Sequence, residues 1–488
     1  KARWFTRNAL EGGEAKELYH INNIWAGSSA TSGLYYFLMF PPDLPATPDP
    51  RPAMNTTFWD PSWQKLLSRP DWTAEATSFN WQCHWTKINH QAGDGNQFEF
   101  YRKGEWLTKE RSGYTNDNIG TTSEFHNTLA LKNDVPPSMQ WYEGPISERG
   151  GQWKEGLNAG DPVALKSIGN DYAYATGVST PLYNRYSGAS DIEHASRSIF
   201  WLKPDHIFVY DRAQSKSEDR FKRFFLQFTA APQVQGRNAT IFTPGHQKLF
   251  LSNLLPEGAK LTPSVSEKLS ALAEQEFTTH QIKIEDPSNP KDIRFLNILQ
   301  GADSASLKDD VLLVQSIAGT AFEGAALRET CVLMIKNWDE IFTNTSFSVP
   351  HTVKFIYVTG VKPYSGYRIS AKSVANQTEI LVNNGTDIFA DDGGVILIDL
   401  NKINTSVEPK IISEDNSLSL FINPNPSYGC TKIQYNLTSS GLTEIELLDL
   451  SGRKVAIVLD KKWHSIGSYQ IDFCPEGLDP GVYICLLS

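Results

Sequence analysis

The feature that most constrains the fold of this chain is a long series of short strand-like runs, from Trp59 to about Leu400, with little helical periodicity. Residues 172–176 form one such run, in which aromatic and small residues alternate. Residues 198–202 form another, and Lys203-Pro204-Asp205 separates it from a third run at 207–210. Turn residues between repeated short strands favour antiparallel pairing. The chain is therefore predicted to be mainly β and to contain a large antiparallel β-sandwich.

Charged and polar side chains gather in one stretch of this series, residues 89–127. Phe98, Phe100 and Trp106 recur in it as the apolar positions of a half-buried pair of strands, with Lys103-Gly104 at the turn. A hairpin that carries so many histidine, acidic and basic side chains indicates a functional site.

Several positions of this stretch form a recognisable pattern: His90, Asp94, Phe98, Gly104, Leu107, Gly113, Tyr114 and His126-Asn127-Thr128. The pattern resembles the start of the β-sandwich domain of heparinase II/III-type polysaccharide lyases. Ala92 stands where that family has a second histidine, and Glu110 stands where an aspartate is usual. The resemblance extends over about residues 1–400, and it includes the strands around Arg197 and Arg212. We expect these two arginines to be structural ion-pair partners rather than ligand contacts.

The resemblance implies a metal site, but this sequence lacks one of the family's ligands. In the family the second histidine, the acid and the later histidine commonly hold zinc, which would make Glu110 and His126 metal residues here. Because Ala92 removes one ligand, a tetrahedral site would need a substitute such as Asp94 or water. We therefore expect zinc binding to be weak or substoichiometric.

The resemblance also implies β-elimination next to a uronic acid. That reaction requires neutralisation of the carboxylate, a base for the α-proton and an acid for the leaving oxygen. In the family, a histidine of the β-domain faces the catalytic tyrosine of an α/α toroid. His90 corresponds to that histidine, so it is the expected catalytic residue. The alternative is that His90 is a structural histidine whose hydrogen bonds are made within a turn. The residues expected to bind substrate are Asn89, Gln91, Tyr101, Arg102, Lys109 and Arg111, for which a solvated strand face or rim packing is the alternative.

The ends of the chain differ from its middle. Residues 1–40 show helical spacing, and six prolines between Pro41 and Pro52 end it. By resemblance, residues 1–50 are the last helices of an α/α toroid, most of which would lie outside this sequence, and residues 51–405 are the β-sandwich. The start of the chain lacks Met and a signal segment, so we expect it to be processed or incomplete.

A polar linker at 406–416 leads to a small β-rich module at 417–488. Its three motifs, at 421–426, 449–455 and 478–484, resemble the C-terminal sorting domain of the type IX secretion system of Bacteroidetes. The resemblance implies a protein that is secreted or held at the surface of a Gram-negative bacterium, with the type IX machinery as a partner. The alternative is an immunoglobulin-like appendage that binds sugar or stiffens the chain.

Composition excludes some classes of protein. The formal net charge is −10, from 45 basic and 55 acidic residues, which disfavours nucleic-acid binding. Apolar runs are too short for a membrane helix, which needs about 18 residues. The five cysteines are far apart and form no zinc motif. They are either buried free thiols, or Cys430 forms a disulfide with Cys474 or Cys485.

Three functions remain open at this point. The first is a secreted polysaccharide lyase, for which the substrate is an acidic glycan and this chain supplies the C-terminal β-domains. The second is a non-catalytic carbohydrate-binding or scaffold protein, which Ala92 and the missing toroid favour. The third is a metal-dependent hydrolase built on His90, Glu110 and His126, whose spacing matches no compact metal motif.

Overall fold

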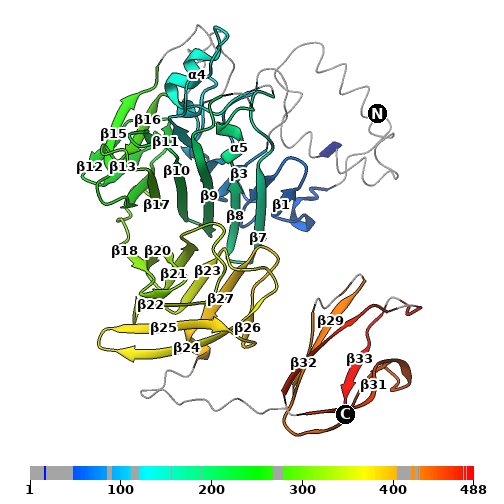
Figure 1. The fold of residues 1–488 in the computed structure, drawn as a ribbon. Helices are drawn as coiled ribbons and strands as arrows, with labels where there is room; N and C mark the ends of the chain where they lie inside the picture. Colours follow the sequence, from blue (N-terminus) through cyan, green and yellow to red (C-terminus); the bar gives the residue numbers. More distant parts are fainter. Residues whose placement is uncertain are drawn as a thin grey trace. The chain divides into compact units, whose positions relative to one another are not determined.

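The computed structural model describes residues 16–17, 48–84, 91–111, 120–154, 156–186, 188–267, 278–403, 419–423, 427, 429–465, 467–475, 477–479 and 481–488. Strands dominate this part of the chain, and its α-helices α4 (Gly144–Arg149) and α5 (Thr180–Tyr183) are short (Figure 1). The prediction of a mainly β protein is confirmed. The expected helices in residues 1–40 lie outside the described residues, apart from Lys16 and Glu17, which are helical.

The N-terminal sheet is antiparallel and has the order β1-β2-β3-β4-β5. Its strands are β1 (Thr57–Asp60), β2 (Lys65–Ser68), β3 (Ser78–Gln82), β4 (Gln97–Arg102) and β5 (Glu105–Thr108), and the short 3-10 helix η1 (Arg51–Ala53) precedes them. Alternate residues face opposite sides of a strand. Phe79, Trp81, Phe98 and Phe100 are fully buried on the inner face, so the residues between them lie on the outer face.

Two further sheets enclose the inner face of the N-terminal sheet. The larger has the order β12-β13-β14-β17-β10-β9-β8-β7, and the smaller has the order β15-β16-β11-β6. The strands of the larger sheet are β7 (Val163–Ile168), β8 (Tyr172–Val178), β9 (Ile192–Leu202), β10 (His206–Ser215), β12 (Pro232–Gln235), β13 (Asn238–Phe242), β14 (Gln247–Leu255) and β17 (Asp292–Asp303). The smaller sheet consists of β6 (Leu129–Leu131), β11 (Lys222–Phe228), β15 (Lys260–Val265) and β16 (His280–Glu285). The three sheets share one apolar core.

The strands β9 and β10 are buried on both faces. Trp201 and Val209 belong to the core shared with the N-terminal sheet, whereas Phe200 and Phe208 belong to a second core that includes Val332. A strand with two buried faces reads as a continuous apolar run, which explains the sequence at 198–202 and 207–210.

The second core includes side chains of a five-stranded sheet with the order β18-β20-β21-β23-β27. Another five-stranded sheet has the order β19-β22-β25-β24-β26. Their strands are β18 (Val311–Gln315), β19 (Ala318–Gly319), β20 (Phe322–Leu327), β21 (Thr330–Ile335), β22 (Asn344–Pro350), β23 (Phe355–Thr359), β24 (Gly366–Val374), β25 (Gln377–Asn384), β26 (Ile388–Phe389) and β27 (Val395–Asp399), followed by the 3-10 helix η4 (Leu400–Lys402). The strands β21 and β23 are parallel, so the expectation of antiparallel pairing fails for this pair.

Residues 371–374 and 404–488 form a compact unit separate from the remainder. Its strands are β28 (Ser419–Asn423), β29 (Thr431–Leu437), β30 (Gly441–Leu448), β31 (Lys454–His464), β32 (Gly467–Phe473) and β33 (Ile484–Leu487). They form two three-stranded sheets around Ile433, Tyr435, Leu437 and Ile445.

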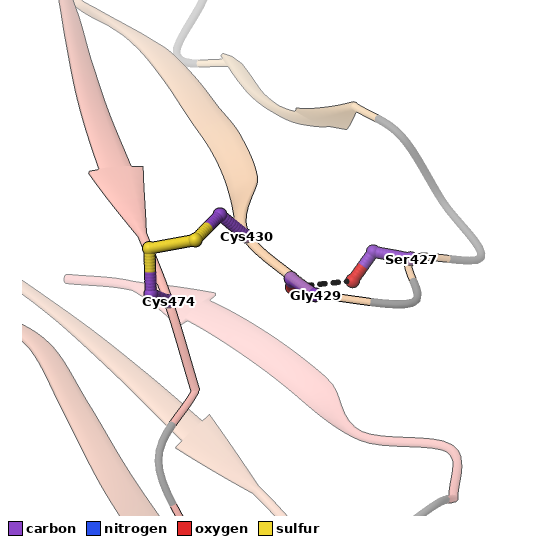
Figure 2. Close-up of a disulfide and its surroundings, with 4 residues drawn as sticks. All are labelled: Ser427, Gly429, Cys430 and Cys474. Atoms are coloured by element: carbon purple, nitrogen blue, oxygen red, sulfur yellow. Dashed lines mark hydrogen bonds between the residues drawn. A yellow bond between two sulfur atoms is a disulfide. The ribbon is translucent and has the colours of Figure 1, made fainter.

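A disulfide joins Cys430 to Cys474 in this unit, at the end of the β29–β32 pair (Figure 2). It is one of the two bridges that the sequence left open. Cys83 and Cys331 are buried free thiols, and Cys485 is free and half-buried. No helix in the described ranges has the length and apolar character needed to cross a membrane.

Candidate functional site

The β4–β5 hairpin forms as predicted, with its turn at Lys103-Gly104. The φ angles of these residues are 46° and 85°, which is the left-handed backbone of a two-residue hairpin turn. A register shift after Phe100 makes Tyr101 pair with Trp106. The two rings lie 5.0 Å apart on the outer face of the sheet. The predicted alternation therefore holds for Phe98 and Phe100 but does not extend to Trp106.

A buried ion pair holds the start of the hairpin. Arg197 on β9 donates to Asp211 on β10, with Nε 2.7 Å from Oδ1 and Nη2 3.0 Å from Oδ2. Its Nη1 donates to the carbonyl oxygens of Asn96 and Asn127. The structural role expected for Arg197 is confirmed. Arg212 is structural in another way, because it donates to two backbone carbonyl groups and a serine hydroxyl.

Asp94, Glu110 and His126 form what we call the acid–base cluster. Asp94 precedes β4, Glu110 follows β5, and His126 follows the 3-10 helix η2 (Ser123–Phe125). Glu110 Oε2 lies 2.6 Å from His126 Nδ1, and Asp94 Oδ2 accepts a hydrogen bond of 2.7 Å from Gln82 Nε2. Asp94 and His126 are both buried. The hairpin thus brings two carboxyl groups and an imidazole together away from bulk water.

The surroundings raise the pKa values of Asp94 and His126. Burial, and then the negative charge of Glu110, raise the pKa of Asp94 to about 7. Burial lowers the pKa of His126, but the hydrogen bond and charge of Glu110 and the charge of Asp94 outweigh that effect and raise it overall. Groups that titrate near the working pH are the most effective proton donors and acceptors. The acid–base cluster is therefore suited to hold and transfer a proton near neutral pH.

One atom of the cluster lacks a partner. His126 Nε2 is buried and makes no hydrogen bond within the described part of the chain. A buried polar atom without a partner costs about 1–3 kcal/mol, so a group that bonds to Nε2 would be stabilised there. Lys154 is buried close by, and its charge acts on His126 to lower its pKa.

Four of the predicted site residues flank the hairpin in the sequence, and the structure describes two of them. His90 and Asn89 lie outside the described residues. Gln91 is buried at the cluster, where its Nε2 lies 3.4 Å from Asp94 Oδ1. Arg111 is also buried, and its guanidinium donates to the carbonyl oxygen of Glu267.

The predicted residues on β4 and β5 divide between the two faces of the sheet. Tyr101 and Lys109 lie on the outer side, where Lys109 Nζ is 4.0 Å from Glu99 Oε1. Arg102 faces inward and forms ion pairs of 2.8 Å with Asp205 and 2.7 Å with Asp303. It lines a cavity of about 890 Å³ at the far end of β4, roughly 20 Å of strand from the cluster. The structure therefore gathers Gln91, Glu110 and His126 and separates Arg102 from them.

The metal residues that the resemblance implies do not form a cation site as they stand. Glu110 and His126 bond to each other, and no group of three or more His, Cys, Asp or Glu side chains in the described ranges could hold an ion. Zinc at His126 Nδ1 would compete directly with the Glu110 hydrogen bond. Three protein ligands are the usual minimum for zinc, so this donor set does not fit the metal.

Sequence reasoning missed four residues of β3 and β4 that extend the site: Asn80, Gln82, Gln97 and Glu99. Asn80 and Gln82 alternate with the buried Phe79 and Trp81, so the period of two in the sequence was the available signal. They were not assigned to the site because only strand pairing brings them beside β4.

Comparison with known proteins gives matches among solved structures alone. No protein-family model and no curated protein matches the chain. Heparan sulfate lyase HepC from Pedobacter heparinus is 12% identical with a TM-score of 0.45, and the match covers 65% of this chain and 46% of that one. A heparinase III structure is 12% identical with a TM-score of 0.42, covering 57% of this chain and 42% of that one. Another heparinase III gene product is 11% identical with a TM-score of 0.44. The chain spans less than half the length of each.

Proposed function

We propose that this protein is a secreted polysaccharide lyase that cleaves a uronic-acid-containing glycan by β-elimination, with this chain supplying the β-domain side of the active site. The observation that supports it most is the acid–base cluster beside the β4–β5 hairpin, in which the pKa of Asp94 is raised to about 7 and the pKa of His126 is also raised. A reaction whose steps are two proton transfers needs such groups.

In the proposed mechanism His90 contacts the substrate, either as the base or as a donor to the uronate carboxylate. The acid–base cluster lies at Gln91, the next residue in the chain, and supplies or removes the proton that His90 exchanges. Glu110 orients the ring of His126 through Nδ1, which leaves Nε2 as the open position of the imidazole. An oriented imidazole loses less entropy on reaching the transition state than a free one.

We propose that the protein binds zinc weakly or substoichiometrically. An ion held by both Glu110 and His126 Nδ1 would have to break their hydrogen bond of 2.6 Å, whereas an ion at His126 Nε2 would leave it intact. The proposed proton transfers use the side chains of this chain alone.

Incubation with uronic-acid polymers tests the proposal. A lyase releases products with an unsaturated terminal sugar that absorbs ultraviolet light, whereas a hydrolase releases saturated ones. The test covers the 488-residue chain and any longer form from the native source, because the complete active site by resemblance also includes a toroid. Hydrolytic products, or no unsaturated product from either form, would contradict the proposal.

A second candidate function is carbohydrate binding without catalysis. It is favoured by the half-exposed rings of Tyr101 and Trp106 on the outer face, since aromatic rings stack on sugars without any chemistry. Tight binding of a glycan that is never cleaved would support this function over the first.

We further propose that the C-terminal unit is a type IX sorting module. The support is its three motifs and its separate core of Ile433, Tyr435, Leu437 and Ile445. Partners of the protein would then be the type IX machinery and an acidic polysaccharide.

A further inference from the structure

A row of amide and carboxyl side chains extends from the acid–base cluster along the outer face of the N-terminal sheet. In the register of β3 with β4, Asn80 pairs with Glu99 and Gln82 pairs with Gln97. Both pairs face outward, because the residues between them are in the inner core. We call these four residues the outer strip.

The outer strip contains two buried oxygen atoms that the protein leaves without a partner. Asn80 Oδ1 and Gln97 Oε1 are both buried and make no hydrogen bond within the described residues. The orientation of the Asn80 amide is set by its other end, where Nδ2 donates to Glu99 Oε2 at 2.7 Å. The unpaired atom of Asn80 is therefore an acceptor rather than a donor.

The outer strip is continuous with the cluster at one end and with aromatic rings at the other. Gln82 Nε2 donates to Asp94 Oδ2 at 2.7 Å, so the strip begins at the cluster. On the same face β4 continues to Tyr101, whose ring lies 5.0 Å from that of Trp106. The successive rows of side chains are about 7 Å apart, which is close to the size of one sugar residue.

The chemistry of the unpaired atoms defines the ligand. An amide oxygen accepts hydrogen bonds, so its partner must be a donor. Sugar hydroxyl groups donate, whereas an ionised carboxylate or sulfate group only accepts. The charges beside the strip also give no preference for an anion, because Lys109 lies 4.0 Å from Glu99 and Asp94 is close to Gln82. The strip is suited to the hydroxyl groups of a ligand and not to its acidic groups.

We infer that the outer strip is a sugar-binding subsite next to the acid–base cluster, in which Asn80 and Gln97 accept hydrogen bonds from the hydroxyl groups of a neighbouring sugar residue. This inference rests on the proposed function and specifies which part of the glycan is recognised there. Binding would supply the donors that the buried oxygen atoms lack.

Apolar replacements of similar size test the inference. Asn80→Leu and Gln97→Leu remove an acceptor from the strip without removing volume. We expect each variant to bind unsulfated hyaluronan and alginate hexasaccharides about two- to tenfold more weakly than the wild-type chain, as the loss of one hydrogen bond requires. We also expect an equal or higher thermal unfolding temperature for Gln97→Leu, because an unpaired buried polar atom is lost, whereas Asn80→Leu also loses the hydrogen bond from Nδ2 to Glu99 and should unfold at a slightly lower temperature.

A matched control is Gln152→Leu. Gln152 is a buried amide whose groups are paired: Oε1 accepts from the Gly95 amide, and Nε2 donates to the Gly95 carbonyl and to Tyr183. This variant should unfold at a lower temperature. A similar fall for Gln97→Leu would show that its amide is structural and would overturn the inference.

O-methylated hexasaccharides, which lack hydroxyl donors, provide the second arm. They should bind the wild-type chain and the two strip variants equally, whereas unmodified hexasaccharides should distinguish them. Equal binding of the unmodified sugars by all three proteins would overturn the inference. Binding with the expected differences but without unsaturated product would retain the subsite and reject the lyase function, while no binding to the wild-type chain would overturn both.

Discussion

Glu110 Oε2 and His126 Nδ1 lie 2.6 Å apart beneath the β4–β5 hairpin, with the His126 side chain 5% exposed and that of Glu110 19% exposed. The pair joins the end of β5 to the residue after η2. Because the hydrogen bond occupies Nδ1, it determines which nitrogen of His126 is open. This relationship connects the stability of the hairpin with its proposed chemistry.

Glu110→Gln should weaken the fold most at low pH. The pKa of His126 is raised in the folded protein, so its stabilising contribution is complete below the pKa of the unfolded chain and is lost as the pH rises through the folded value. We expect a loss of about 1.5–3 kcal/mol in the free energy of unfolding at about pH 5, and a smaller loss in alkaline solution. Urea unfolding at several pH values measures this, and a loss that does not depend on pH would contradict the role of the pair.

Asp94→Asn should remove the pH dependence of folding stability that Asp94 causes in the wild-type protein. Because the pKa of Asp94 is raised to about 7 in the folded state, the protonated carboxyl stabilises the fold at low pH, and that contribution is lost between about 4 and 7 as the pH rises. Asparagine cannot ionise and still accepts from Gln82. The unfolding temperature of the variant relative to wild type should therefore increase across this interval, and parallel curves would refute the raised pKa.

Zinc content of the purified protein tests the metal proposal. Because Ala92 stands where the resembling family has a histidine ligand, we predict weak or substoichiometric zinc. Elemental analysis after dialysis against a chelator is the measurement. One zinc per chain after that treatment would instead make Glu110 and His126 metal ligands.

His90→Ala, made in whichever form of the protein shows lyase activity, should lower turnover by about 10²–10⁴, the usual effect of losing one acid–base group. Affinity for the glycan should fall less, because contacts such as those of Tyr101 and Lys109 remain. Initial rates of unsaturated product formation and direct binding measurements separate the two effects. Unchanged turnover would place the proton transfer elsewhere.

Deletion of residues 417–488 should leave the larger unit folded, because the two units have separate cores. The deletion should also abolish export, because it removes the proposed sorting module. Thermal unfolding of the truncated protein and its amount outside the cell test the two parts. Normal external levels would reject the sorting role. A truncated protein that does not fold would show that the module supports the larger unit.

The sequence by itself determined the local features of this protein. The mainly β class follows from the period of the apolar residues, and the turn at Lys103-Gly104 follows from turn chemistry. These depend on residues close in the chain or on the composition of single strands, so they are readable without coordinates.

The tertiary structure alone decided which side chains meet. Arg102 was grouped with its neighbours in the chain, yet strand alternation turns it inward to partners 103 and 201 residues away. Asn80 joins the candidate site because β3 pairs with β4 across a long intervening segment. The raised pKa of Asp94 arises from burial and the approach of Glu110. Pairing register and burial are properties of the assembled sheets, and no local pattern of residues encodes them.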